Sequence, residues 1–105
     1  LDLGPASKGH CLILPKTHAA NLYELPDEVA AKALVLAKKM AVKLKNGLHC
    51  DGINLVQNNE EAAGQTVPHF HIHLIPRTAG DGMGLNWKPG KLTDQMREEV
   101  LNKVI

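Results

Sequence analysis

The sequence predicts one small domain of mixed secondary structure, built from short strands, one long helix and a second helix near the C-terminal end. Three patterns support this fold class: short apolar runs bounded by glycine and proline, a long segment of helical periodicity, and a strictly alternating segment near residue 70. The chain has 105 residues, which suits one domain rather than two. We therefore expect residues 1–105 to form a single domain.

The first complete strand is expected over residues 10–15 (HCLILP). It ends at Pro15 because proline cannot donate a hydrogen bond to a neighbouring strand. Residues 1–3 alternate Leu, Asp and Leu, as at the end of another strand, so we expect that an upstream segment is missing. The glycines and proline of residues 4–9 predict a turn between the two.

The long helix is expected to start at Pro26, which fits the first turn, followed by acidic residues that suit the positive end of the helix dipole. Apolar residues then recur at three- and four-residue steps and form one stripe: Val29, Ala33, Leu36, Ala37, Met40 and Leu44. Five lysines lie largely off this stripe, which predicts a solvated face: Lys32, Lys38, Lys39, Lys43 and Lys45. Gly47 can take a positive φ and is expected to end the helix.

The C-terminal part is expected to be irregular before it becomes helical again. Residues 77–84 and 87–90 contain glycine and proline without periodicity, which predicts loops. Thr93 fits the N-cap of a second helix. The apolar positions of that helix are Met96, Val100, Leu101 and Val104.

The core must be built from aliphatic residues because the chain has only three aromatic ones, Tyr23, Phe70 and Trp87. So small a core is thin for a free-standing monomer, which favours oligomerisation. Cys11 and Cys50 are far apart in sequence and form no Cys-x-x-Cys pair. We therefore expect two buried free thiols in a reducing, cytoplasmic environment rather than a disulfide.

Charge and hydropathy argue against two classes of partner. Twelve basic and 11 acidic residues give a formal net charge of +1, too little for electrostatic binding to a nucleic acid backbone. No apolar run approaches the roughly 20 residues needed to cross a bilayer. We therefore expect neither a nucleic acid nor a membrane as partner.

Six histidines are unusual in so short a chain, and three of them alternate with apolar residues over residues 69–75 (HFHIHLI). Strands are expected here, within residues 65–76, and over residues 53–57. Successive side chains of a strand point to opposite faces, so one set should pack on the long helix: Phe70, Ile72 and Leu74. The imidazoles should share the other face, with Cα atoms roughly 6.6 Å apart at each step: His69, His71 and His73.

Three interpretations of these imidazoles stay open. A row of solvent-facing histidines would need a coincidence of register. A metal site would use at most two of them, because the outer two stand about 13 Å apart along a strand, and its further ligands would be His10 or His18. Catalysis on a phosphate ester would use one imidazole as nucleophile and its neighbours to bind or protonate phosphate oxygens.

The pattern His-φ-His-φ-His-φ-φ, with φ apolar, resembles the signature of the histidine triad (HIT) family, and the segment HFHIHLI matches it at every position. The similarity extends over nearly the whole chain, through GHCLILPKTH, LPDE, DGINLVQNN, AGQTV and HIHLIPR. It implies an α+β domain with an antiparallel sheet, a long helix and a homodimer. It also implies hydrolysis or transfer at the α-phosphate of a nucleotide, usually a purine, through a covalent nucleotidyl-histidine intermediate.

The resemblance implies roles for four histidines. His71 would be the nucleophile that takes the nucleotidyl group, while His69 and His73 would orient it and contact phosphate. His10 matches a fourth histidine that lies beside the triad. No cofactor is required by this chemistry.

The resemblance also implies a set of nucleotide-binding residues. Asn58, Gln65 and Thr66 match residues around the phosphates and the leaving group. Asp2 matches an acidic residue that holds the ribose hydroxyls, and Leu3 would lie near the base. Neutral amide and hydroxyl donors suit a site that binds an anion without a basic surface.

The chain departs from the family pattern in three places. Many bacterial-type members hold structural zinc with an N-terminal Cys-x-x-Cys pair and two histidines, whose positions His18 and His69 match. That cysteine pair is absent here, so zinc is expected only if an upstream segment supplies it. Pro68 removes a hydrogen-bond donor just before the triad, and Glu60 and Glu61 stand where a glycine-containing turn is common.

Two other functions stay open beside a nucleotide hydrolase or transferase. One is a nucleotide-binding regulatory protein with little turnover, and the other is a histidine-based zinc-binding module. The leaving group, from a nucleoside phosphoramidate or a dinucleoside polyphosphate, is not fixed by these residues.

Overall fold

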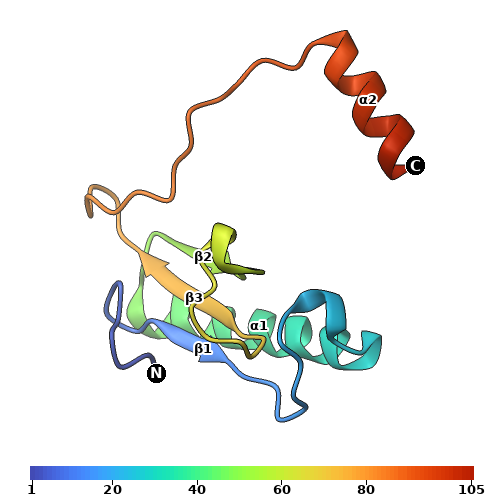
Figure 1. Ribbon diagram of the computed structural model, residues 1–105. Helices are drawn as coiled ribbons and strands as arrows, with labels where there is room; N and C mark the ends of the chain where they lie inside the picture. Colours follow the sequence, from blue (N-terminus) through green and yellow to red (C-terminus); the bar gives the residue numbers. More distant parts are fainter.

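A computed structural model describes all 105 residues. Strands β1 (Cys11–Ile13), β2 (Gly52–Val56) and β3 (Ile72–Arg77) form one antiparallel sheet in the order β1-β3-β2 (Figure 1). Helix α1 (Asp27–Leu48) covers one face of this sheet. Helix α2 (Asp94–Val104) ends the chain, and two short 3₁₀ helices, η1 (Leu22–Glu24) and η2 (Glu61–Ala63), lie in the connections. The α+β class, the antiparallel sheet and both expected helices are therefore confirmed.

The core lies between α1 and the sheet, and the apolar residues of the histidine segment are central to it. Phe70, Ile72 and Leu74 are all buried and belong to one cluster with Ala33 and Ala37 of α1. This confirms the expected apolar face. Because Leu74 lies on the central strand, it is flanked on both sides, by Cys11 of β1 and by Leu55 of β2.

Strand register places His73 on the other face of the sheet. His73 is paired with Leu12 of β1 and with Val56 of β2. Since side chains alternate along a strand, His73 points away from the face on which its neighbour Leu74 meets α1. The sheet therefore presents one histidine of the segment from its central strand.

The expected seven-residue strand over residues 69–75 is wrong in its first part, because β3 begins only at Ile72. The amide of Phe70 donates instead to the carbonyl of Ala19, and the amide of His69 donates to Val67. These bonds fold the approach to β3 against a loop rather than against a strand. His69 and His71 are consequently placed by loop contacts, not by strand alternation.

Two other local expectations also need correction. Gly47 does not end α1, which continues to Leu48; His49 takes the left-handed conformation instead, with φ 54° and ψ 35°. Its amide still satisfies the carbonyl of Lys45, and histidine is among the residues that tolerate this region. Residues 1–3 form no strand, although the amide of Asp2 donates to the carbonyl of His10 at 2.9 Å.

The C-terminal helix forms where it was expected. The hydroxyl of Thr93 caps it by accepting a hydrogen bond from the amide of Met96 at 3.1 Å. Residues 78–93 contain no helix or strand, and they carry α2 away from the sheet (Figure 1). No residue of α2 is buried.

Two further findings concern the whole chain. Cys11 and Cys50 are buried and unpaired, as expected. Neither helix has the combination of length and hydropathy that a membrane-spanning segment requires.

Candidate active site

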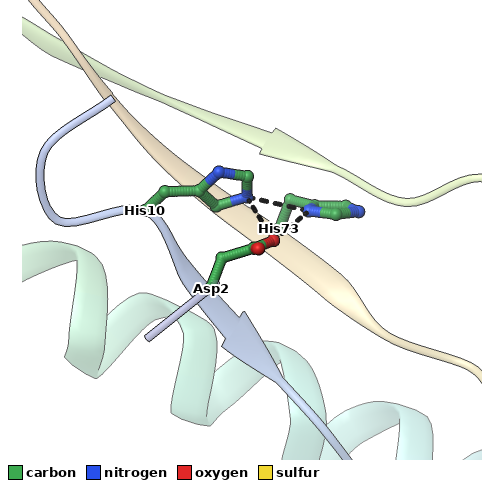
Figure 2. Close-up of side chains that lie close together, drawn as sticks. All are labelled: Asp2, His10 and His73. Atoms are coloured by element: carbon green, nitrogen blue, oxygen red, sulfur yellow. Dashed lines mark hydrogen bonds and ion pairs between the residues drawn. The ribbon is translucent and has the colours of Figure 1, made fainter. Parts of the chain in front are cut away.

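Three side chains from distant parts of the sequence converge beside the central strand (Figure 2). Nε2 of His10 lies 2.9 Å from Nδ1 of His73. The carboxylate of Asp2 lies 3.5 Å from the same nitrogen of His10 and 4.0 Å from Nδ1 of His73. His10 is buried, whereas about a fifth of each of the other two side chains is exposed.

The turn before β1 positions His10. The hydroxyl of Ser7 donates to the carbonyl of Pro76 at 2.7 Å and ties this turn to β3. Gly9 has a φ of 90°, and a side chain there would collide with Leu48 at the end of α1. The amide of Ala6 then reaches back and donates to Nδ1 of His10 at 2.9 Å. The turn thus fixes the plane of the ring and directs its other nitrogen toward His73.

His71 lies next to this cluster, with its ring centre 4.9 Å from that of His73. Its Nδ1 is 2.7 Å from the carbonyl of His69. A carbonyl accepts only, so Nδ1 carries the proton, and in the neutral ring Nε2 keeps a free lone pair. The side chain is partly exposed, so a reactant can reach that nitrogen.

His69 does not join the other two imidazoles of the segment. Its Nδ1 lies 3.1 Å from Nδ1 of His18, and its Nε2 lies 2.9 Å from the carbonyl of Pro15. The expectation of three imidazoles on one strand face is therefore corrected. Because β3 starts only after His71, strand alternation does not align the three rings. The structure groups His71 and His73 with His10 and pairs His69 with His18.

The two histidine pairs differ in their fit to a metal ion. In the pair of His18 and His69, two nitrogens converge at 3.1 Å, close to the roughly 3.3 Å between ligands of a tetrahedral zinc. Nε2 of His69 donates to a carbonyl, as metal-binding imidazoles usually do. This pair would supply two of the four ligands of a structural zinc site. The other two would have to come from an upstream cysteine pair, so zinc binding stays a prediction.

The cluster of Asp2, His10 and His73 also brings three ligand atoms within 4.8 Å of one another. However, the Ala6 amide occupies the Nδ1 lone pair of His10. A metal on Nε2 would then require a fully deprotonated ring, because neither nitrogen could hold a proton. The donor set therefore does not fit a metal ion.

Electrostatics favour a neutral His73. Burial lowers its pKa below the ordinary value, and the charges that His71 and His10 would carry when protonated lower it further. The carboxylate of Asp2 opposes these effects in part. At pH 7 the ring is therefore mainly uncharged.

Gln65 is engaged with the backbone of its own loop. Its amide nitrogen donates to the carbonyls of Ala20 and Val67, at 2.6 and 2.9 Å, and its oxygen accepts from the amide of Glu60 at 2.7 Å. Glu60 has a φ of 71° and a ψ of 161°, a region that essentially only glycine occupies. Gln65 thus holds the strained turn at Glu60.

The remaining expected binding residues lie around this loop and at the N-terminus. Thr66 is exposed, and Asn58 is partly exposed, with its side chain against Gly64. Leu3 is fully exposed, next to Asp2. None of the three hydrogen-bonds to the histidine cluster through its side chain, so their roles stay predictions.

Several groups that shape the site were not predicted from the sequence because they are backbone atoms. The amide of Ala6 orients His10, and the carbonyls of Pro15 and His69 orient the rings of His69 and His71. Side-chain type carries no signal for such groups. The glycine-rich turn over residues 4–9 indicated a tight loop but not its hydrogen bond to an imidazole.

Known proteins resemble this chain over most of its length. The family model described as the HIT domain matches residues 1–80, which include every histidine of the site. The chain is 44% identical to Protein hit of Bacillus subtilis over 89 residues, covering 84% of this chain and 61% of that protein. It is 39% identical to adenosine 5′-monophosphoramidase HNT1 of Saccharomyces cerevisiae, covering 99% of this chain and 66% of that protein.

Solved structures of HIT family proteins share the fold of this chain. A crystal structure of a HIT family protein from Bacillus anthracis superposes with a TM-score of 0.89 at 37% identity, over 99% of this chain and 76% of the other. The chain thus spans roughly three-fifths to three-quarters of the length of these relatives. Matched in sequence over most of its length and in structure over nearly all of it, the chain belongs to the HIT family.

Proposed function

We propose that this protein hydrolyses, or transfers a group at, the α-phosphate of a purine nucleotide. The observation that carries the proposal is the state of His71, a partly exposed imidazole whose Nδ1–H is held by the carbonyl of His69, leaving Nε2 free to attack. An oriented, neutral imidazole is a competent nucleophile near pH 7. The relative in S. cerevisiae, named as an adenosine 5′-monophosphoramidase, supports the same substrate class.

In the first step, the lone pair on Nε2 of His71 forms a bond to the α-phosphorus. The bond from phosphorus to the leaving nitrogen or oxygen breaks, and its electron pair leaves with that atom. A leaving amine takes up a proton from solvent, and the nucleotidyl group stays on Nε2. The carbonyl of His69 continues to hold Nδ1–H, so the cationic ring of the intermediate remains oriented.

In the second step, water attacks the phosphorus of the intermediate. The bond between phosphorus and Nε2 breaks, its electron pair returns to His71, and the water releases a proton to solvent. One water is consumed overall: its hydroxyl ends on the nucleoside monophosphate and its proton replaces the one taken by the amine. Splitting one displacement into two easier ones is the advantage of the covalent route.

The proposal is tested with two substrates that share an adenosine α-phosphate but differ in leaving group. We expect the purified protein to release AMP from adenosine 5′-phosphoramidate with a higher kcat/KM than from a dinucleoside tetraphosphate. The comparison separates a phosphoramidase from a polyphosphate hydrolase. Tight binding of AMP in calorimetry, with no turnover of either substrate, would contradict hydrolysis and favour a regulatory nucleotide-binding protein.

We also propose that the active form is a homodimer, as the family resemblance implies. Strand β2 is an open edge of the sheet. Leu55 on this strand is 47% exposed, and Leu34 of α1 is 59% exposed. They line a mainly apolar groove with six further residues: Leu22, Ala30, Val56, Gln57, Phe70 and Ile72. A second copy would pair the open edge and cover these side chains.

The dimer is tested by placing a charge in the groove. We expect sedimentation velocity to show a dimer for the wild type and a monomer for Leu34→Glu, because a buried carboxylate without a partner is costly. Leu14→Glu is the matched control: Leu14 is equally exposed, at 59%, but lies outside the groove. A monomeric wild type, or a Leu34→Glu variant that stays dimeric, would refute this interface.

A further inference from the structure

We infer that His10 is a positioning residue that fixes the proton of His73 on Nε2 and so presents His73 to the site as a neutral hydrogen-bond donor. The inference rests on the proposed function for its catalytic meaning. The position of the proton itself follows from hydrogen bonds alone, through three successive steps.

The first step is set by a backbone group. The amide of Ala6 can only donate, and it lies 2.9 Å from Nδ1 of His10. Nδ1 must therefore be the unprotonated nitrogen of that ring. Neutral His10, which is buried, consequently carries its single proton on Nε2.

The second step decides where this proton points. Nε2 of His10 has two acceptors within reach, Nδ1 of His73 at 2.9 Å and the carboxylate of Asp2 at 3.5 Å (Figure 2). The first distance is that of an ordinary hydrogen bond and the second is at its outer limit. His10 therefore donates to His73, and Asp2 adds a weaker electrostatic contact.

The third step transfers the constraint to His73. Since its Nδ1 accepts from His10, neutral His73 carries its proton on Nε2. Adding a second proton at Nδ1 would place two N–H groups face to face at 2.9 Å. The other charged or titratable groups facing this ring are Asp2 and His71, and the lowered pKa of His73 agrees with this opposition.

The outcome is a pair of neighbouring rings in opposite states. His71 presents a lone pair on Nε2 because a carbonyl holds its Nδ1–H, whereas His73 presents Nε2–H because His10 donates to its Nδ1. Their ring centres are 4.9 Å apart. A nucleophile and a donor for a phosphate oxygen are thus set side by side by two backbone groups, the carbonyl of His69 and the amide of Ala6.

The proton position is measured by long-range ¹H–¹⁵N correlation on protein labelled at histidine, above pH 7. In the wild type we expect His73 to show a protonated Nε2 and an unprotonated Nδ1, and His71 to show the reverse. This measurement needs neither substrate nor turnover, so its result is independent of the proposed function. A protonated Nδ1 on His73 would overturn the inference directly.

Three variants of His10 test the cause. His10→Gln offers an oxygen to the Ala6 amide and an N–H to His73, so it should keep the wild-type proton pattern. His10→Glu offers only acceptors and should move the proton of His73 to Nδ1. His10→Leu removes both partners and should leave a mixture of the two tautomers.

Activity should follow the proton pattern. We expect kcat to fall by about 10²-fold in His10→Glu, at the lower end of what one preorganised hydrogen-bond donor contributes. His10→Gln should recover most of the activity that His10→Leu loses. The pH profile of His10→Glu should shift to higher pH as its carboxylate favours charged His73. An unchanged His73 tautomer in His10→Glu and His10→Leu, or an equal loss of activity in His10→Gln and His10→Glu, would refute the positioning role.

Discussion

His71→Ala is expected to lower kcat for adenosine 5′-phosphoramidate by at least about 10³-fold, the scale on which removal of a nucleophile acts. Alanine cannot bond to phosphorus, so the two-step route is lost. Binding of AMP should change far less, because the neighbouring rings and Asp2 stay in place. The measurement is single-turnover and steady-state AMP release, with calorimetry for AMP affinity.

His49→Asn is the matched control for this prediction. His49 is exposed, lies at the end of α1 outside the site, and has a φ of 54° that asparagine also tolerates. We expect its kcat to equal that of the wild type. A His71→Ala variant that turns over within tenfold of the wild type would show that another group attacks the phosphate.

Leu74→Ala is expected to lower the free energy of unfolding by about 2–5 kcal/mol. Leu74 is fully buried on the central strand, between β1 and β2 and against the core cluster of α1. The truncation removes apolar surface and leaves a cavity that neighbouring strands cannot collapse to fill. Since a domain of this size has a total stability of about 5–15 kcal/mol, this single change consumes a large share of it.

Urea denaturation at one protein concentration measures this loss, because concentration matters if the protein associates. Leu14→Ala is the control, since Leu14 is 59% exposed and its truncation should change stability by no more than about 0.5 kcal/mol. Equal effects of the two variants would mean that the core does not centre on β3. Leu74 also follows His73 directly on β3. The residual activity of the variant therefore shows how far packing of the core positions His73.

Much of the fold could be predicted from the sequence because apolar periodicity and helix-capping residues determine where its helices and buried faces form. The apolar stripe of α1, the Thr93 cap of α2 and the buried side chains of Phe70, Ile72 and Leu74 follow from periodicity and capping preferences. The start of β3 did not, because the amide of His69 bonds locally to Val67 and the amide of Phe70 finds its partner in the distant loop at Ala19. Tertiary hydrogen bonds overrode an alternation that is perfect in the sequence.

The candidate site shows the same division. Histidine spacing predicted His71 and His73 as neighbours, and the family resemblance added His10 and Asp2, which the structure brings to the same cluster. The resemblance also matched His18 and His69 to the two histidines of one zinc site, and the structure places their Nδ1 atoms 3.1 Å apart. The loop course that seats Nε2 of His69 on the Pro15 carbonyl was not predicted. Backbone donors and acceptors, invisible in residue type, set the proton positions on which the chemistry depends.

The most direct test of the account is to trap the intermediate. The protein is mixed with adenosine 5′-phosphoramidate, quenched within one turnover at alkaline pH to preserve a phosphorus–nitrogen bond, digested and analysed by mass spectrometry. We predict an adenylyl group on the peptide that contains residues 69–75, localised to His71 by fragmentation and absent from His71→Ala. Full turnover with no adenylylated peptide, or with the group on a different residue, would contradict attack by His71.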